Sequence, residues 1–231
     1  MIVEQRELGL VAREVLDLVR SVPRRFIRRE IEKFGDHLVL FVSVGVLDIL
    51  EIARSTDALV TVRKRALKVI FDVALEQPNT SLDLEELRAI VVDADDTELQ
   101  AAATLVLGAI ADERGEAVVN AVDRPAIGAI VELLDGEEAS HREAASSLCS
   151  CLVVRSPDAR DRVLPVLFDL LEDESHVVRA NAVWALSLSL ESSLDDRSKR
   201  EIGDVLRTVS ETDDDPDIRA LTRALLEEST R

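Results

Sequence analysis

The stretch DESHVVRANAVWALSLSL, residues 173–190, decides the fold. It opens with acidic residues and a Val-Arg pair, and small or apolar residues then recur at intervals of three and four. Counted from Arg179, offsets −1, +3, +6, +7 and +10 lie on one face of a helix. Acidic residues just before such a helix suit its N-terminus, where free N–H groups favour an anion or a capping side chain. The stretch therefore predicts a helix with one buried face.

Four other stretches repeat this pattern, at residues 57–74, 95–111, 137–153 and 213–228. The positions that match Arg179 are Arg63, Gln100, Arg142 and Arg219, and the spacings along the chain are 37, 42, 37 and 40 residues. Only Gln100 departs from arginine. We expect five equivalent helices near residues 58–75, 96–111, 138–153, 175–190 and 216–228.

Segments with a period near 3.6 lie between these five helices, for example Leu84, Leu87, Ile90 and Val91. The connectors are short and polar, and strand signals are absent. Each unit is therefore a helical hairpin of about 40 residues, which cannot bury its apolar face alone and is stabilised by stacking. The fold class predicted is all-α.

The repeated acidic turn, Val-Arg pair, alanine and Ala-Leu pair resemble the HEAT/armadillo class of α-solenoids, most clearly in DESHVVRANAVWAL. The resemblance implies a superhelix of about five hairpins over residues 37–231. Residues 1–36 fit the pattern poorly and are expected to form an N-terminal helical cap that is continuous with this domain. In the family the repeated arginine pairs with acidic turn residues, and the second helix of each hairpin lines the concave surface. The fold alone does not specify a role.

The chain is strongly acidic, with a net charge of −18, and only four of its 28 basic residues are lysines. This composition is typical of proteins from salt-loving organisms, in which dense carboxylates maintain solubility. The alternative is an acidic surface that binds a basic partner. Either interpretation counts against nucleic-acid binding, because an acidic surface repels phosphates.

Salt adaptation predicts that the melting temperature rises steeply from dilute buffer into molar potassium chloride, because salt screens the repulsion between carboxylates. Thermal melts across a potassium chloride series measure this. A flat profile would contradict salt adaptation and favour the basic-partner interpretation.

The cysteines and the apolar segments of the sequence bear on where the protein is located in the cell. Cys149 and Cys151 lie two residues apart in an apolar helical stretch, which predicts buried thiols rather than a disulfide or a metal pair. Residues 1–20 carry too many charges for a signal peptide, and the apolar run Leu38–Leu47 is too short to span a bilayer. We expect a cytoplasmic protein.

A candidate partner-binding row lies at offsets +1, +5, +8 and +12, which point away from the core-facing side of the five helices. It contains small residues and one tryptophan, and such a shallow groove with an aromatic anchor suits a peptide or an amphipathic helix. The residues predicted to bind a partner are Trp184, Leu105, Phe71, Ser147, Ser150, Ala180 and Ser187. The alternative for Trp184 is packing against the neighbouring hairpin.

No catalytic or metal-binding constellation is evident in the sequence. Glu137, Glu138 and His141 have a spacing that suits a metal, but no further nearby His or Cys completes a set. The serines lack a His–Asp partner pattern, and no glycine-rich phosphate loop occurs. The sequence thus predicts no enzyme activity, no cofactor and no metal.

The positive charge gathers in RSVPRRFIRREIEKF, residues 20–34, which has six basic and two acidic residues. It reads as an amphipathic helix over residues 24–34, with Arg24, Arg25, Arg28 and Arg29 opposite an apolar face. One interpretation is a cap whose apolar face closes the first hairpin, since solenoids need capped ends. The other is docking to an anionic surface, either lipid, nucleic acid or an acidic protein.

These observations predict a non-catalytic scaffold or adaptor that binds another protein through its concave surface, with a role in regulation or signalling. Two alternatives remain open. One is an accessory or lyase-like subunit that assists an enzyme or a cofactor attachment, as some HEAT-like families do. The other is binding of nucleic acid or another anionic surface through the basic N-terminal segment. The sequence leaves the oligomeric state open.

Overall fold

The computed structural model describes residues 49–76 and 81–229. Within these ranges the regular structure is entirely helical and no strand occurs, as the repeat predicts. The second helices of the hairpins, which we call inner helices, are α4 (Val60–Glu76), α6 (Thr97–Ala121), α8 (Ala139–Arg155), α10 (His176–Ser189) and α12 (Pro216–Glu228). The outer helices are α5 (Leu84–Asp93), α7 (Arg124–Leu134), α9 (Pro157–Asp169) with the 3₁₀ turn η2 (Leu170–Glu172), and α11 (Asp196–Thr212). Residues 49–54 are helical and precede α4.

Acidic residues start most of these helices, as expected. The Asp83 carboxylate accepts hydrogen bonds from the N–H groups of Glu85 and Glu86, and Asp96 accepts one from Leu99. Asp123, Asp195 and Asp215 cap α7, α11 and α12 in the same way. These bonds satisfy N–H groups that have no partner inside the helix, so the acidic turns fix where each helix begins.

The bounds predicted for the inner helices are confirmed to within two residues, except at the end of α6. We expected that helix to end near residue 111, but it continues to Ala121 through a kink at Arg114, with φ −123° and ψ 28°. The polar run Asp112–Gly115 had the composition of a turn. In the structure Gly115 is buried, and Nε of Arg155 lies 2.8 Å from where a Cβ at Gly115 would be. The glycine thus allows the Arg155 side chain of α8 to lie across α6.

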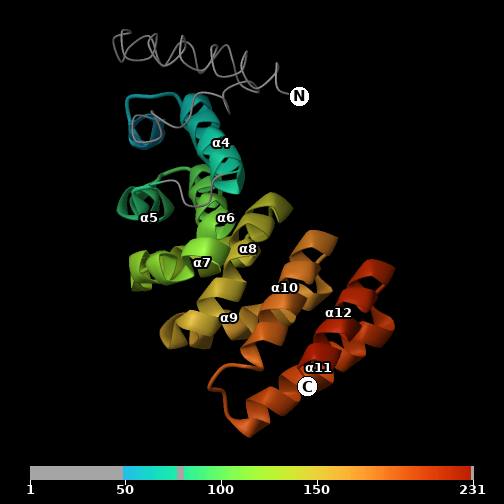
Figure 1. Ribbon diagram of the computed structural model, residues 1–231. Helices are drawn as coiled ribbons and strands as arrows, with labels where there is room; N and C mark the ends of the chain where they lie inside the picture. The colour runs from blue at the N-terminus through green and yellow to red at the C-terminus, as the bar shows by residue number, and fades with distance from the viewer. Residues whose placement is uncertain (1–48, 77–80, 230–231) are drawn as a thin grey trace, which may run out of the picture.

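The hairpins stack into two layers, with the inner helices in one and the outer helices in the other (Figure 1). Neighbouring inner helices contact one another more extensively than neighbouring outer helices do. This close packing agrees with the inner helices being the layer that, by the family resemblance, lines the concave side.

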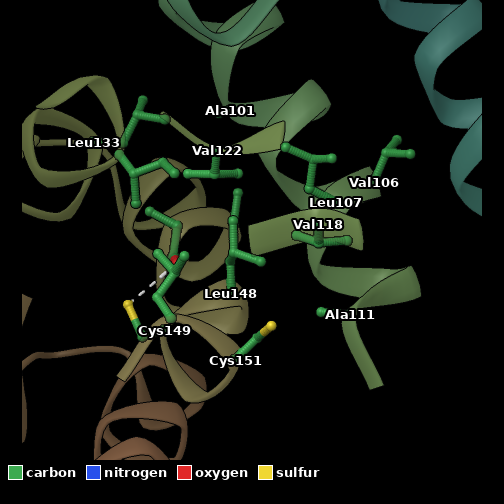
Figure 2. Packing of buried hydrophobic residues seen from close by; sticks show 14 of the residues in the cluster. Ala101, Val106, Leu107, Ala111, Val118, Val122, Leu133, Leu148, Cys149 and Cys151 are labelled. Atoms are coloured by element: carbon green, nitrogen blue, oxygen red, sulfur yellow. Dashed lines mark hydrogen bonds between the residues drawn. The ribbon is translucent and has the colours of Figure 1, made fainter. Parts of the chain in front are cut away.

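A continuous apolar core fills the space between the layers and passes from hairpin to hairpin. Figure 2 shows its centre, where Leu107 and Val118 of α6 lie near Leu148 of α8. Cys149 and Cys151 belong to the same core and are free thiols, as predicted. Burial raises the pKa of the Cys149 thiol to about 12, so this side chain stays protonated.

Candidate functional site

The predicted row of partner-binding residues lies on the inner helices. We use the name concave strip for Ala101, Leu105 and Gly108 of α6, Ser147 and Ser150 of α8, and Ala180, Trp184 and Ser187 of α10. None of these side chains is charged, although 32% of the chain is Asp, Glu, Lys or Arg. A strip without charge on such a protein favours a ligand that contacts it through apolar and backbone groups.

Trp184 is the most exposed large side chain of the strip. Its exposed fraction is 43%, whereas fully packed residues of the same helix, such as Val183 and Leu186, have none. Leu105, Ser147, Ser150 and Ala180 are partly exposed. Phe71 of α4, which the sequence placed in the same row, is also partly exposed and packs against the core.

Other residues at the predicted partner-binding positions are almost completely covered and leave little surface for a ligand to contact. Ser187 is 6% exposed and Ala101 4%, because the next helix covers positions on the sides of the row. Gly108 lies against α8, and a Cβ at this position would stand 2.4 Å from Oγ of Ser147. The glycine therefore allows α6 and α8 to approach closely beneath the strip.

Val154, which is 41% exposed at the end of α8, was not named among the candidate residues. It lies at offset +12 from Arg142, an offset that belongs to the predicted row. Its apolar side chain extends the exposed apolar surface on the inner layer.

The hydroxyl groups of the strip donate within their own helices. Ser147 donates to the carbonyl oxygen of Ala144 at 2.7 Å, and Ser187 donates to that of Trp184 at 2.8 Å. Beside the strip, Asn181 donates to Ser146 Oγ at 3.0 Å and so joins α10 to α8. These bonds fix the side chains in place, so the strip is a preorganised surface.

Both lysines at the same helical offsets form ion pairs. Lys64 pairs with Glu98, and Lys68 lies 3.0 Å from Asp72. These pairs reduce the positive charge that a ligand would meet. Glu143 of α8 accepts a hydrogen bond of 2.7 Å from the Ser175 hydroxyl and keeps its negative charge beside the strip.

The repeated arginines bind turns of their own and the next hairpin, as the resemblance implied. Nη1 of Arg179 donates to the carbonyl oxygen of Asp173, at 2.8 Å, in its own turn. Its Nε and Nη2 donate to the two carboxylate oxygens of Asp213, at 3.0 and 3.1 Å, in the following turn. Arg142 binds Gly136 and Asp173 in the same manner. We call these contacts the arginine ladder.

The departure at Gln100 follows from the ladder. Nε2 of Gln100 donates to the carbonyl oxygen of Ala94, which is the turn contact that each ladder arginine makes six residues back. The second contact of Arg142 and Arg179 goes to Asp173 and Asp213, which lie six residues before the next repeated arginine. The residue at the matching position for Gln100 is Gly136, which has no carboxylate. A glutamine thus keeps the contact within its own turn, and position 136, which matches Asp173 and Asp213 of the later turns, carries no side chain to receive a second one.

The ladder aspartates are held ionised. Burial by itself would raise the pKa of Asp213, but hydrogen bonds from Arg179 and from the Asp215 N–H lower it by more, so its pKa lies below the ordinary value. Asp173 is shifted in the same direction, for the same reasons, by Arg142 and the Ser175 N–H. The ladder residues are thus committed to holding turns together.

The region around His141 does not form a metal site in the structure. Among residues 49–76 and 81–229, no group of three His, Cys, Asp or Glu side chains could hold a metal ion. The backbone carbonyl of Glu137 accepts from Nη1 of Arg142 at 2.7 Å, which makes this turn part of the ladder.

The four arginines of the basic segment, Arg24, Arg25, Arg28 and Arg29, lie outside the described residues, as do the predicted cap and most of its boundary with the solenoid. Among the helices that are described, none has the length and apolar character to cross a membrane.

The chain is similar in structure to several engineered repeat proteins. One is an engineered protein from a structural genomics consortium, which shares 18% identity over 95% of this chain and 96% of that one, with a TM-score of 0.71. A designed armadillo repeat protein shares 17% identity over 93% of this chain and 98% of its own, with a TM-score of 0.67. Another designed armadillo repeat protein, solved in complex with the peptide (KR)4, shares 20% identity over 96% of this chain and 93% of its own, with a TM-score of 0.61.

No protein-family model matches the chain, and no curated protein does. At identities of 20% and below, the structural likeness speaks for the fold alone. The fold is an armadillo- or HEAT-like helical repeat.

Proposed function

We propose that this chain is a non-catalytic scaffold that binds an extended peptide or a helix of another protein along the concave strip. The observation that carries the proposal is the 43% exposure of Trp184, the chain's sole tryptophan, on an inner helix. Exposed aromatic side chains on a preorganised surface are the residues that most often dominate peptide affinity.

The surroundings of Trp184 support a ligand with few charges. The strip is uncharged, its hydroxyl groups donate within their helices, and Val154 adds apolar surface on the adjacent α8. A solved neighbour of the same fold is complexed with a peptide, which shows that such a scaffold can hold one. That peptide is basic, whereas the uncharged strip favours an apolar anchor residue here.

The test uses Trp184 as its own probe. Peptides selected from a displayed random library against the full chain are titrated while tryptophan emission is followed. Because a bound peptide removes water from the indole, the emission should shift to shorter wavelengths. The Trp184→Ala variant has no tryptophan, so its affinity and that of the wild type are compared by fluorescence anisotropy of the labelled peptides. The variant should bind them more weakly by about 2 kcal/mol, or roughly thirtyfold.

A matched control removes another exposed apolar side chain. Leu59 is 67% exposed and lies before α4, outside the strip, so Leu59→Ala should leave peptide affinity unchanged. Thermal melts of both variants show whether folding is affected, and the loss for Trp184→Ala should stay below the roughly 3–5 kcal/mol of a buried aromatic truncation. Equal binding by wild type and Trp184→Ala would refute the proposal.

A further inference from the structure

A second surface lies outside the concave strip, between α9–η2 and α11. It is an open groove of about 580 Å³. Its apolar lining comes from Phe168, Leu171, Val205 and Val209, and its acidic lining comes from Glu172, Asp173, Glu174, Asp213 and Asp214. Thr208, Thr212 and Arg179, which binds Asp213, complete the lining. We call this surface the acidic groove.

The acidic groove results from the connector between α10 and α11. A single residue, Ser156, separates α8 from α9, whereas residues 190–195 separate α10 from α11. The longer connector lets α11 begin farther from its predecessor, and α9 and α11 make few contacts, unlike α7 and α9. The apolar side chains that would otherwise meet across this layer are left to line the groove.

Some carboxylates at the groove have no cationic partner. Asp173 and Asp213 bind ladder arginines, and Glu174 lies 3.3 Å from Nη2 of Arg142. For Glu172 and Asp214, both exposed, the structure gives no ion pair with any described residue. The groove therefore combines an apolar surface with two exposed carboxylates that form no ion pair within the described part of the chain, which fits a ligand that is both apolar and cationic.

We propose that the acidic groove binds residues 20–34 of a second copy of this chain. This segment carries a net charge of +4 in a chain of −18. On a helix its Phe26 and Ile31 share one face while Arg25 and Arg28 share the other, so it has the apolar and cationic character that the groove requires. The inference is independent of peptide binding on the concave strip.

A second copy fits better than the same copy. Fifteen residues lead from Phe34 to Ile49 at the first described helix, and they span at most about 50 Å when fully extended. That connection contains the apolar run Leu38–Leu47, which would have to stretch across the solvated surface. Exposing that run is costly, at about 25 cal/mol for each Å² of apolar surface. Binding between copies avoids this cost and joins one end of a chain to the other end of its neighbour.

The first experiment measures the contact directly. The labelled peptide RSVPRRFIRREIEKF is titrated, by fluorescence anisotropy, with full-length protein in which Arg24, Arg25, Arg28 and Arg29 are replaced by Gln. This receptor cannot occupy its own groove. We expect saturable binding in dilute potassium chloride, and about tenfold weaker binding when the receptor also carries Glu172→Gln and Asp214→Asn.

The matched control receptor carries Glu132→Gln and Asp161→Asn, which remove two exposed carboxylates away from the groove. It should bind the peptide within about twofold of the parent receptor. A peptide with Phe26→Ser and Ile31→Ser keeps its charge and should also bind weakly, because the apolar lining then has no partner. Absence of saturable binding, or an equal loss in the control receptor, would overturn the proposal.

The second experiment separates two copies from one. Sedimentation of the wild-type chain in dilute potassium chloride should give a mass that rises with protein concentration, and Glu172→Gln with Asp214→Asn should suppress the rise. The wild-type chain could instead stay monomeric at all concentrations while the receptor with Arg24, Arg25, Arg28 and Arg29 replaced by Gln binds the peptide. Residues 20–34 would then fill the groove of their own copy. That result would overturn the proposal of a second copy.

Discussion

Arg179→Gln is expected to lower the free energy of unfolding by about 3 kcal/mol, because it leaves a buried carboxylate without its partner. The Asp213 side chain is 5% exposed and receives two hydrogen bonds from the Arg179 guanidinium. The glutamine can still reach the carbonyl of Asp173, as Gln100 reaches that of Ala94. The decrease in the free energy of unfolding therefore reports the contact between Arg179 and the next hairpin. Urea unfolding of the wild type and the variant measures this decrease.

The double variant Arg179→Gln, Asp213→Asn should be more stable than the sum of its single variants predicts, since the asparagine removes the unpaired charge. The expected coupling is about 1–3 kcal/mol. The natural pair Gln100 and Gly136 already combines a glutamine with a residue that has no carboxylate at the matching position.

The control for Arg179→Gln is Arg124→Gln on the outer layer. Arg124 also pairs with the next hairpin, through Asp158 at 3.0 Å, but the two side chains are 72% and 52% exposed. Exposed pairs contribute little, so this variant should lose less than about 1 kcal/mol. Equal losses in the two variants would mean that burial of Asp213 is not the cause.

The coupling should also depend on pH. The pKa of Asp213 is lowered in the folded chain. The ionised carboxylate therefore adds to the free energy of unfolding when the pH is above the pKa of the unfolded chain, about 3.9, and this stabilisation is lost as the pH falls through the pKa of the folded chain. The difference between wild type and Arg179→Gln should therefore shrink in acid. A difference that stays constant down to the acid transition would contradict the assignment to the ionised carboxylate.

The sequence was sufficient to predict the repeat, because each hairpin carries the same local signals. An acidic cap, an arginine and a small residue three positions later recur in register. The helix bounds followed from these local signals, whereas the pairing of the repeated arginines with acidic turns was implied by the family resemblance. The continuation of α6 beyond residue 111 did not follow from the local signals, and there the Arg155 side chain of another helix packs against Gly115, a contact that the local sequence does not contain.

The candidate surfaces were only partly predictable. Helical offsets correctly place Trp184 on an exposed side of α10, but they do not show that the adjacent Ser187 is covered. Coverage depends on the distance between neighbouring helices, which is set by contacts such as Gly108 against Ser147. The acidic groove depends on the position of α11 relative to α9, so no single segment of sequence contains it.

Leu148→Ala is the second substitution with a large expected effect. Leu148 lies in α8, the inner helix of the central hairpin, and is fully buried between neighbouring helices (Figure 2). Removing its isobutyl group loses transfer free energy and leaves a cavity, so we expect a loss of about 3–4 kcal/mol in the free energy of unfolding.

The position of Leu148 in the stack adds a second expectation. Each hairpin of a solenoid contacts only its neighbours, so a weakened central interface separates the two halves energetically. Unfolding of Leu148→Ala should therefore become broader or divide into two steps. Circular dichroism measures the loss of helix over the whole chain, and the emission of Trp184 reports only the C-terminal half.

The control is Val154→Ala in the same helix, 41% exposed, which should change stability by less than about 0.5 kcal/mol and leave one sharp transition. A single, equally sharp transition for Leu148→Ala, even with lower stability, would show that the five hairpins unfold as one cooperative unit despite their nearest-neighbour contacts.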